Sequence, residues 1–107
     1  LDQQLDTCMT KNPGTTSERH CMEALLPLWE ARLVSYYQRL GGDQNARLKA
    51  AQDAWRVYAT AQTRYFEQKY DLQGTMYALF LADARLQLLR HRVLQLEYDY
   101  DFFIMHR

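Results

Sequence analysis

The sequence has 107 residues, enough for one hydrophobic core and too few for two comfortable domains, so residues 1–107 are treated as a single domain. Apolar residues make up 48% of it and charged residues 24%, a globular balance that excludes a disordered tail. Thirteen basic and thirteen acidic side chains cancel, which argues against partners recruited by long-range charge, such as nucleic acid or an anionic membrane.

The first predicted helix covers roughly residues 1–10, and its apolar residues share one face at helical spacing. A helix this short is marginal on its own. Cys8 and Cys21 are the only cysteines, and such a pair favours one disulfide in an oxidising compartment, with two buried thiols as the alternative. The bond would join this helix to the next one. Because disulfides form in oxidising compartments, we expect an exported protein, periplasmic or secreted. No signal segment is part of the sequence.

The second predicted helix runs from Thr15 to about Leu40. Thr15 and Glu18 stand at capping-box spacing at its start. Pro27 removes a backbone hydrogen bond, which predicts a kink near residues 23–27. An apolar stripe that faces the core recurs every three or four residues, at Cys21, Leu25, Trp29, Leu33, Tyr36 and Leu40.

The third predicted helix covers about residues 44–70, with Asp43 as its cap and no glycine or proline inside it. Its stripe is Leu48, Ala51, Trp55, Tyr58, Gln62 and Tyr65. The fourth helix is expected to start at Thr75 as its cap. Its stripe is the most regular, at Leu79, Ala82, Leu86, Leu89, Val93, Leu96, Tyr100 and Phe103.

Short connections between long helices favour antiparallel neighbours. The prediction is an all-α fold in which three long antiparallel helices form a bundle and the short N-terminal helix, held by the disulfide, closes one end. The longest apolar runs fall far short of the roughly 18 residues of a membrane-spanning helix.

Residues suited to catalysis or metal binding are sparse. His20, His91 and His106 belong to no zinc-ligand motif, and the two cysteines are better explained as each other's partner than as a nucleophile. The acidic residues of segment 97–101 resemble a glycosidase pair only superficially, and a solvated helix end explains them better. We therefore expect no enzyme, no metal and no cofactor.

Two segments, 56–64 and 85–92, combine basic residues with nearby aromatic residues in the manner of a nucleic-acid surface, and the zero net charge argues against that interpretation. The aromatic content is high, with eight tyrosines and two tryptophans. Core packing explains the tryptophans and Tyr37. The aromatic residues that are hard to bury together, and so indicate a contact surface, are Tyr65, Tyr70, Tyr77, Tyr98 and Phe102.

Four motifs follow one another along nearly the whole chain. They are Cys21-x7-Trp29-x3-Leu33-x3-Tyr37-Gln38-x-Leu40, Ala51-Gln52-x-Ala54-Trp55-x-x-Tyr58, Gly74-Thr75-Met76-Tyr77 and Arg92-Val93-Leu94-Gln95-Leu96-x-Tyr98. In this order they resemble the LprI-type lysozyme inhibitor family. The resemblance implies an exported bacterial helical protein whose protein partner is a lysozyme or another peptidoglycan hydrolase.

The sequence departs from the family pattern in two places. Many members carry a second cysteine pair in the third and fourth helices, where this chain has Thr60-Ala61-Gln62-Thr63 and Leu79-Phe80-Leu81. Val34 stands where the family often has asparagine. The chain therefore resembles a one-disulfide branch, for which inhibition is a weaker implication.

Motif residues are interpreted as scaffold: Trp29, Tyr37, Gln52, Trp55 and Tyr58. Exposed loops suit a partner's cleft better. One loop is residues 11–16, with Lys11 and Asn12 as candidates. The other is residues 70–77, whose turn is the preferred binding segment; its candidates are Asp71, Gln73, Gly74, Thr75 and Met76.

Two alternatives to lysozyme inhibition stay open. The chain could be an immunity protein against a rival's toxin, or a structural or assembly protein of the cell envelope. In the latter case the aromatic end of the last helix, Tyr98–Ile104, would form a homodimer or dock on a larger complex.

Overall fold

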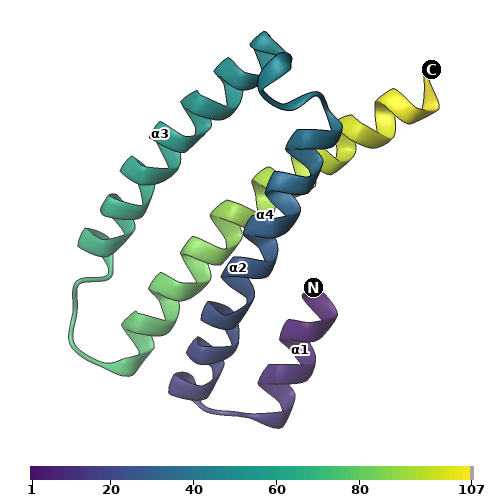
Figure 1. The fold of residues 1–107 in the computed structure, drawn as a ribbon. Helices are drawn as coiled ribbons and strands as arrows, with labels where there is room; N and C mark the ends of the chain where they lie inside the picture. The colour runs from purple at the N-terminus through teal and green to yellow at the C-terminus, as the bar shows by residue number, and fades with distance from the viewer. Residues whose placement is uncertain (107) are drawn as a thin grey trace.

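The computed structural model describes residues 1–106 and shows an all-α chain, as predicted. The helices are α1 (Asp2–Lys11), α2 (Thr15–Arg39), α3 (Ala46–Lys69) and α4 (Thr75–Met105), with a short 3-10 turn, η1 (Gly42–Gln44), before α3. The three long helices run up, down and up, so α2 and α4 point in the same direction and α3 in the opposite one (Figure 1).

The core lies between α2 and α4, which pack along each other for most of their length. Their stripes face each other, and Leu33, Val93 and Leu96 have no exposed surface. The remaining core residues of this pair are Met22, Leu25, Trp29, Ala82, Leu86 and Leu89. Burial of these apolar side chains is the main stabilising contribution to the fold.

Helix α1 packs beside α2 and is attached at both of its ends. Near its C-terminal end the predicted disulfide joins Cys8 to Cys21, with Cα atoms 5.9 Å apart. Near its N-terminal end the Asp2 carboxylate accepts two hydrogen bonds from the Arg90 guanidinium of α4, at 2.7 and 2.9 Å. Arg90 thereby lowers the pKa of Asp2 below its ordinary value.

Helix α3 lies beside the α2–α4 pair, and its separation from α2 grows toward its C-terminal end, so the bundle is uneven (Figure 1). Gln52 is its buried residue. Half of the stripe predicted from its sequence is exposed, namely Ala51, Tyr58 and Tyr65, and the other three residues are only partly buried. The apolar stripe of α3 is incompletely buried because α2 and α4 already bury each other's apolar faces. Helix α3 therefore contacts only the edge of that core.

The helix caps differ from the prediction. Gly14 is the N-cap residue of α2, with a φ of 114°, and no side chain caps this helix, so the Thr15–Glu18 capping box is wrong. Gly74, with a φ of 119°, takes the position expected for Thr75. These positive φ values favour glycine, and each N-cap therefore lies one residue before the threonine that was predicted to cap the helix.

Helix α3 also starts from a different cap. Asp43 lies in η1, and the side chain of Asn45 accepts a hydrogen bond from the Leu48 backbone N–H at 3.2 Å. Asn45 is thus the residue that caps α3. Pro27 lies inside the continuous helix α2, and the kink there stays a prediction.

Candidate functional site

The two loops predicted to bind a partner lie at the same end of the molecule. The Oγ1 atoms of Thr15 and Thr75, 60 positions apart in sequence, are 2.9 Å apart and share a hydrogen bond. Figure 1 shows the two connections, between α1 and α2 and between α3 and α4, at the end opposite the C-terminus. We call residues 11–16 and 70–77 the tip.

Most of the tip is exposed. Every residue from Asp71 to Met76 is exposed, and so are Lys11 and Asn12. Asn12 also has a structural role, because its side-chain Nδ2 donates to the Cys8 carbonyl at 2.9 Å and completes the end of α1. Of the first loop's two candidates, Lys11 is therefore the one more available to a partner.

Two helix starts meet inside the tip. Helices α2 and α4 both begin after a glycine, Gly14 or Gly74, and neither has a side-chain cap. The first N–H groups of a helix have no partner within the helix and carry partial positive charge. Two parallel helices with adjacent starts place two such groups of donors side by side, which favours contact with carboxylates.

The scaffold motif residues occupy different environments. Trp29 is buried in the core with 4% of its surface exposed, and Gln52 with 7%. The Tyr37 hydroxyl donates to Asp43 at 2.6 Å, which raises the pKa of Tyr37 to about 12 and ties α2 to η1. Tyr58, in contrast, is 53% exposed and lies outside the core.

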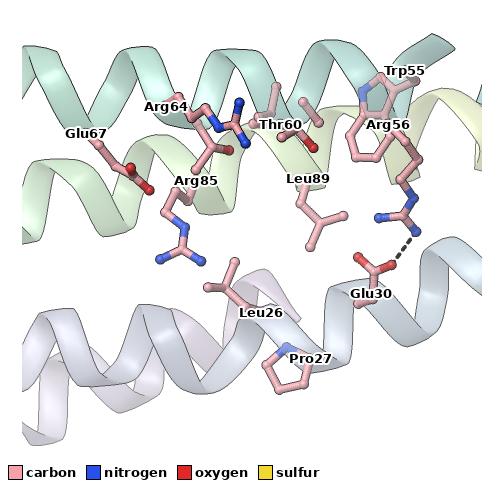
Figure 2. A pocket seen from close by; sticks show the side chains of 13 residues that line it. Leu26, Pro27, Glu30, Trp55, Arg56, Thr60, Arg64, Glu67, Arg85 and Leu89 are labelled. Atoms are coloured by element: carbon pink, nitrogen blue, oxygen red, sulfur yellow. Dashed lines mark hydrogen bonds and ion pairs between the residues drawn. The ribbon is translucent and has the colours of Figure 1, made fainter. Parts of the chain in front are cut away.

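A cleft of about 550 Å³, which was not predicted from the sequence, lies between α3 and the α2–α4 pair. Figure 2 shows its side chains converging from all three helices. Its apolar part comes from Leu26 of α2, Trp55 of α3, and Leu88 and Leu89 of α4. Trp55 is only half-buried because it lines this cleft and does not enter the central core.

Charged side chains surround the apolar part of the cleft. Arg56 of α3 forms an ion pair with Glu30 of α2 across the gap (Figure 2). Arg64, Glu67 and Arg85 line the opposite end. The arginine-rich segments 56–64 and 85–92 contained the signal for this cleft, but the sequence could not show that they face each other.

The last two turns of α4 extend past the end of α2 (Figure 1). Tyr98 is 72% exposed, Phe103 60% and Met105 78%. Tyr100 is the exception on this segment, because its ring lies 5.9 Å from that of Tyr36, by centroids. The aromatic residues of this segment are thus largely exposed, as a contact surface would require.

Nothing in residues 1–106 groups three or more His, Cys, Asp or Glu side chains as a metal site would. Across the same residues, none of the helices combines the length and apolar character needed to span a membrane.

The motifs of the sequence are matched by one known family. The model of the family described as "Lysozyme inhibitor LprI" matches residues 8–96, from the first cysteine of the disulfide to the end of the buried stripe of α4. No curated protein and no solved structure matches the chain. The disulfide and the family match agree with a location outside the cytoplasm. Because the match covers most of its length, the chain belongs to the LprI lysozyme inhibitor family.

Proposed function

We propose that this protein inhibits a lysozyme or a related peptidoglycan hydrolase by inserting its tip into the enzyme's substrate cleft. Membership of the LprI family supports the class of target. The observation that supports the tip as the inhibitory surface is the contact between Thr15 and Thr75, which joins two exposed loops into one projecting end.

The chemistry of the tip suits such a target. Glycoside hydrolases of this kind carry a pair of carboxylic side chains in the substrate cleft. The uncapped starts of α2 and α4 offer backbone N–H donors to carboxylates, and Lys11 adds a positive side chain nearby in sequence. The polar side chains of Asp71 and Gln73 would contact the rim of the cleft.

The tip is also held firmly enough to act as an inhibitor. The first loop is fixed by the disulfide behind it, and the second by the attachment of Thr75 to α2. A preorganised loop loses less conformational entropy on binding than a free one, which increases affinity.

The test is the lysis of bacterial cell walls by lysozymes of several types, with and without the purified protein. We expect inhibition of at least one type by the unmodified chain. Combined replacement of Asp71, Gln73 and Met76 by alanine, with Lys11→Ala, should weaken inhibition at least about tenfold, the loss of roughly 1.4 kcal/mol of binding free energy.

The matched control is Val57→Ser, which changes a side chain that is 73% exposed on α3 and lies outside the tip. This variant should inhibit as strongly as the unmodified protein. Unchanged inhibition in the tip variant would overturn the role of the tip. Absence of inhibition by the unmodified protein across all lysozyme types would overturn the proposed function.

A further inference from the structure

Two surfaces of this molecule are complementary and lack a partner in the described chain. One is the exposed face of the C-terminal end of α4, residues 98–105, which we call the tail. The other is the cleft between α3 and the α2–α4 pair.

The tail has the pattern of a helix that docks in a groove. Tyr98, Asp101, Phe102 and Met105 are spaced i, i+3, i+4 and i+7, so they share one face. All four are exposed, with Tyr98 at 72%, Phe102 at 47% and Met105 at 78%. Three large apolar side chains thus flank one carboxylate on a face that no other element of residues 1–106 covers.

The cleft is lined by apolar and charged side chains, with Glu67 at the same end as Arg64 and Arg85 (Figure 2). Its floor is apolar, and its volume of about 550 Å³ is large enough to accept several side chains. Arg56 is neutralised by Glu30, whereas Arg64 and Arg85 form no ion pair within residues 1–106. An acidic, aromatic helix would place apolar side chains on the floor and a carboxylate near these two guanidinium groups.

The tail cannot reach the cleft of its own chain. Leu89 forms part of the floor, and α4 continues without a break from there to Met105. At a rise of about 1.5 Å per residue, Tyr98 lies roughly 14 Å farther along the same helix and points away from the cleft. The occupant that brings the complementary charge and apolar face must therefore come from a second molecule.

We propose that a second copy of this chain inserts its tail into the cleft, between Arg64 and Arg85, and receives the first copy's tail in return. Exchange of two identical contacts around a twofold axis closes the assembly as a dimer and covers both unpartnered surfaces at once.

A charge-swap experiment tests this assembly. One variant reverses the cleft, with Arg64→Glu and Arg85→Glu, and the other reverses the tail, with Asp101→Lys. Sedimentation and light scattering of the unmodified protein should show a concentration-dependent dimer. Each variant alone should be monomeric, because like charges then meet in both contacts.

An equimolar mixture of the two variants should restore the dimer, because each tail then meets a cleft of opposite charge. Asp6→Lys, which reverses an exposed charge on α1, is the matched control and should dimerise like the unmodified protein. Restoration in the mixture also shows that both variants are folded.

Trp55 provides a local measurement, because it lines the cleft. Dimerisation should move tryptophan emission to shorter wavelength, and this change should disappear in Trp55→Phe while the dimer persists. A protein that stays monomeric up to about 1 mM would overturn the proposal, since the contact would then be weaker than about 4 kcal/mol. A dimer that persists in both single variants, or a mixture that does not restore it, would also overturn the proposal.

Discussion

Gln52 shows how much a single polar residue contributes to the attachment of α3. Its Oε1 accepts a hydrogen bond from Arg92 Nε of α4 at 3.0 Å, and Arg92 Nη1 donates to Gln95 at 2.7 Å. Burial lowers the pKa of Arg92, which reflects the cost of removing a guanidinium from water. The two amides offset part of that cost by accepting hydrogen bonds from it.

We therefore expect Gln52→Leu to destabilise the protein by about 1–3 kcal/mol, because the Arg92 Nε donor would lose its acceptor in a part-buried site. Urea denaturation measures the change. The control is Gln68→Leu, an exposed position on the same helix, which should change stability by no more than about 0.5 kcal/mol. Equal effects of the two replacements would show that the Gln52 hydrogen bond does not stabilise the fold.

At the scale of elements, α1 depends on its attachments more than on its own sequence. It has ten residues, none of them buried, and a helix of this length is marginal in isolation. The Cys8–Cys21 disulfide holds one end, and the Asp2–Arg90 ion pair holds the other. The Asp2 side chain is 58% exposed, so the ion pair is the weaker of the two attachments.

Replacement of both Cys8 and Cys21 by serine should lower the free energy of unfolding by about 3 kcal/mol, because the unfolded chain regains the entropy that a 13-residue separation had restricted. Asp2→Asn is the comparison and should lose no more than about 1 kcal/mol. Denaturation under non-reducing conditions gives both values. A serine variant as stable as the unmodified protein would show that the disulfide does not stabilise the fold.

The helix ranges were predictable from the sequence, whereas the caps were not. Glycine and proline clusters and the three-to-four residue spacing are local signals, and they located α1 to α4 closely. The predicted cap residues of α2 and α4 were wrong because glycines with positive φ, Gly14 and Gly74, are the N-cap residues in place of the threonines beside them. The incomplete burial of the α3 stripe was not predictable for a different reason. Periodicity shows which residues share a face but not whether another helix covers that face.

At the scale of the whole molecule, the α2–α4 pair forms the stable part and α3 the loosely attached part. Within residues 1–106, the buried residues of the hydrophobic core lie on α2 and α4, and the side-chain contacts of α3 with α2 include the exposed Arg56–Glu30 ion pair. Amides in elements with few buried contacts exchange with solvent through local opening, without global unfolding.

Hydrogen exchange followed by mass spectrometry should therefore show earlier exchange in α3, above all toward Lys69, than in residues 25–33 of α2 and 86–96 of α4. Opening of the weakly covered helix requires less free energy than opening of the central pair. Uniform protection of the three long helices would contradict this order and would indicate that α3 unfolds only with the rest of the chain.

The candidate sites differ in how far the sequence could predict them. The tip loops were found because turn residues such as Asp71 and Gly74 mark exposed connections. That the loops adjoin each other, and that Trp55 faces Leu26 and Leu89 across a cleft, depends on the relative placement of helices distant in sequence. No local pattern contains that information.

The shared direction of α2 and α4 has a mechanical consequence for the tip. Both helix starts belong to the same packed pair, and Thr15 and Thr75 join them directly. A swing of α3 would be taken up by residues 70–73, which join Lys69 to the N-cap residue Gly74 and form part of the tip. Widening of the cleft around an incoming helix would therefore displace this part of the tip, while the hydrogen bond between Thr15 and Thr75 would keep the two helix starts together.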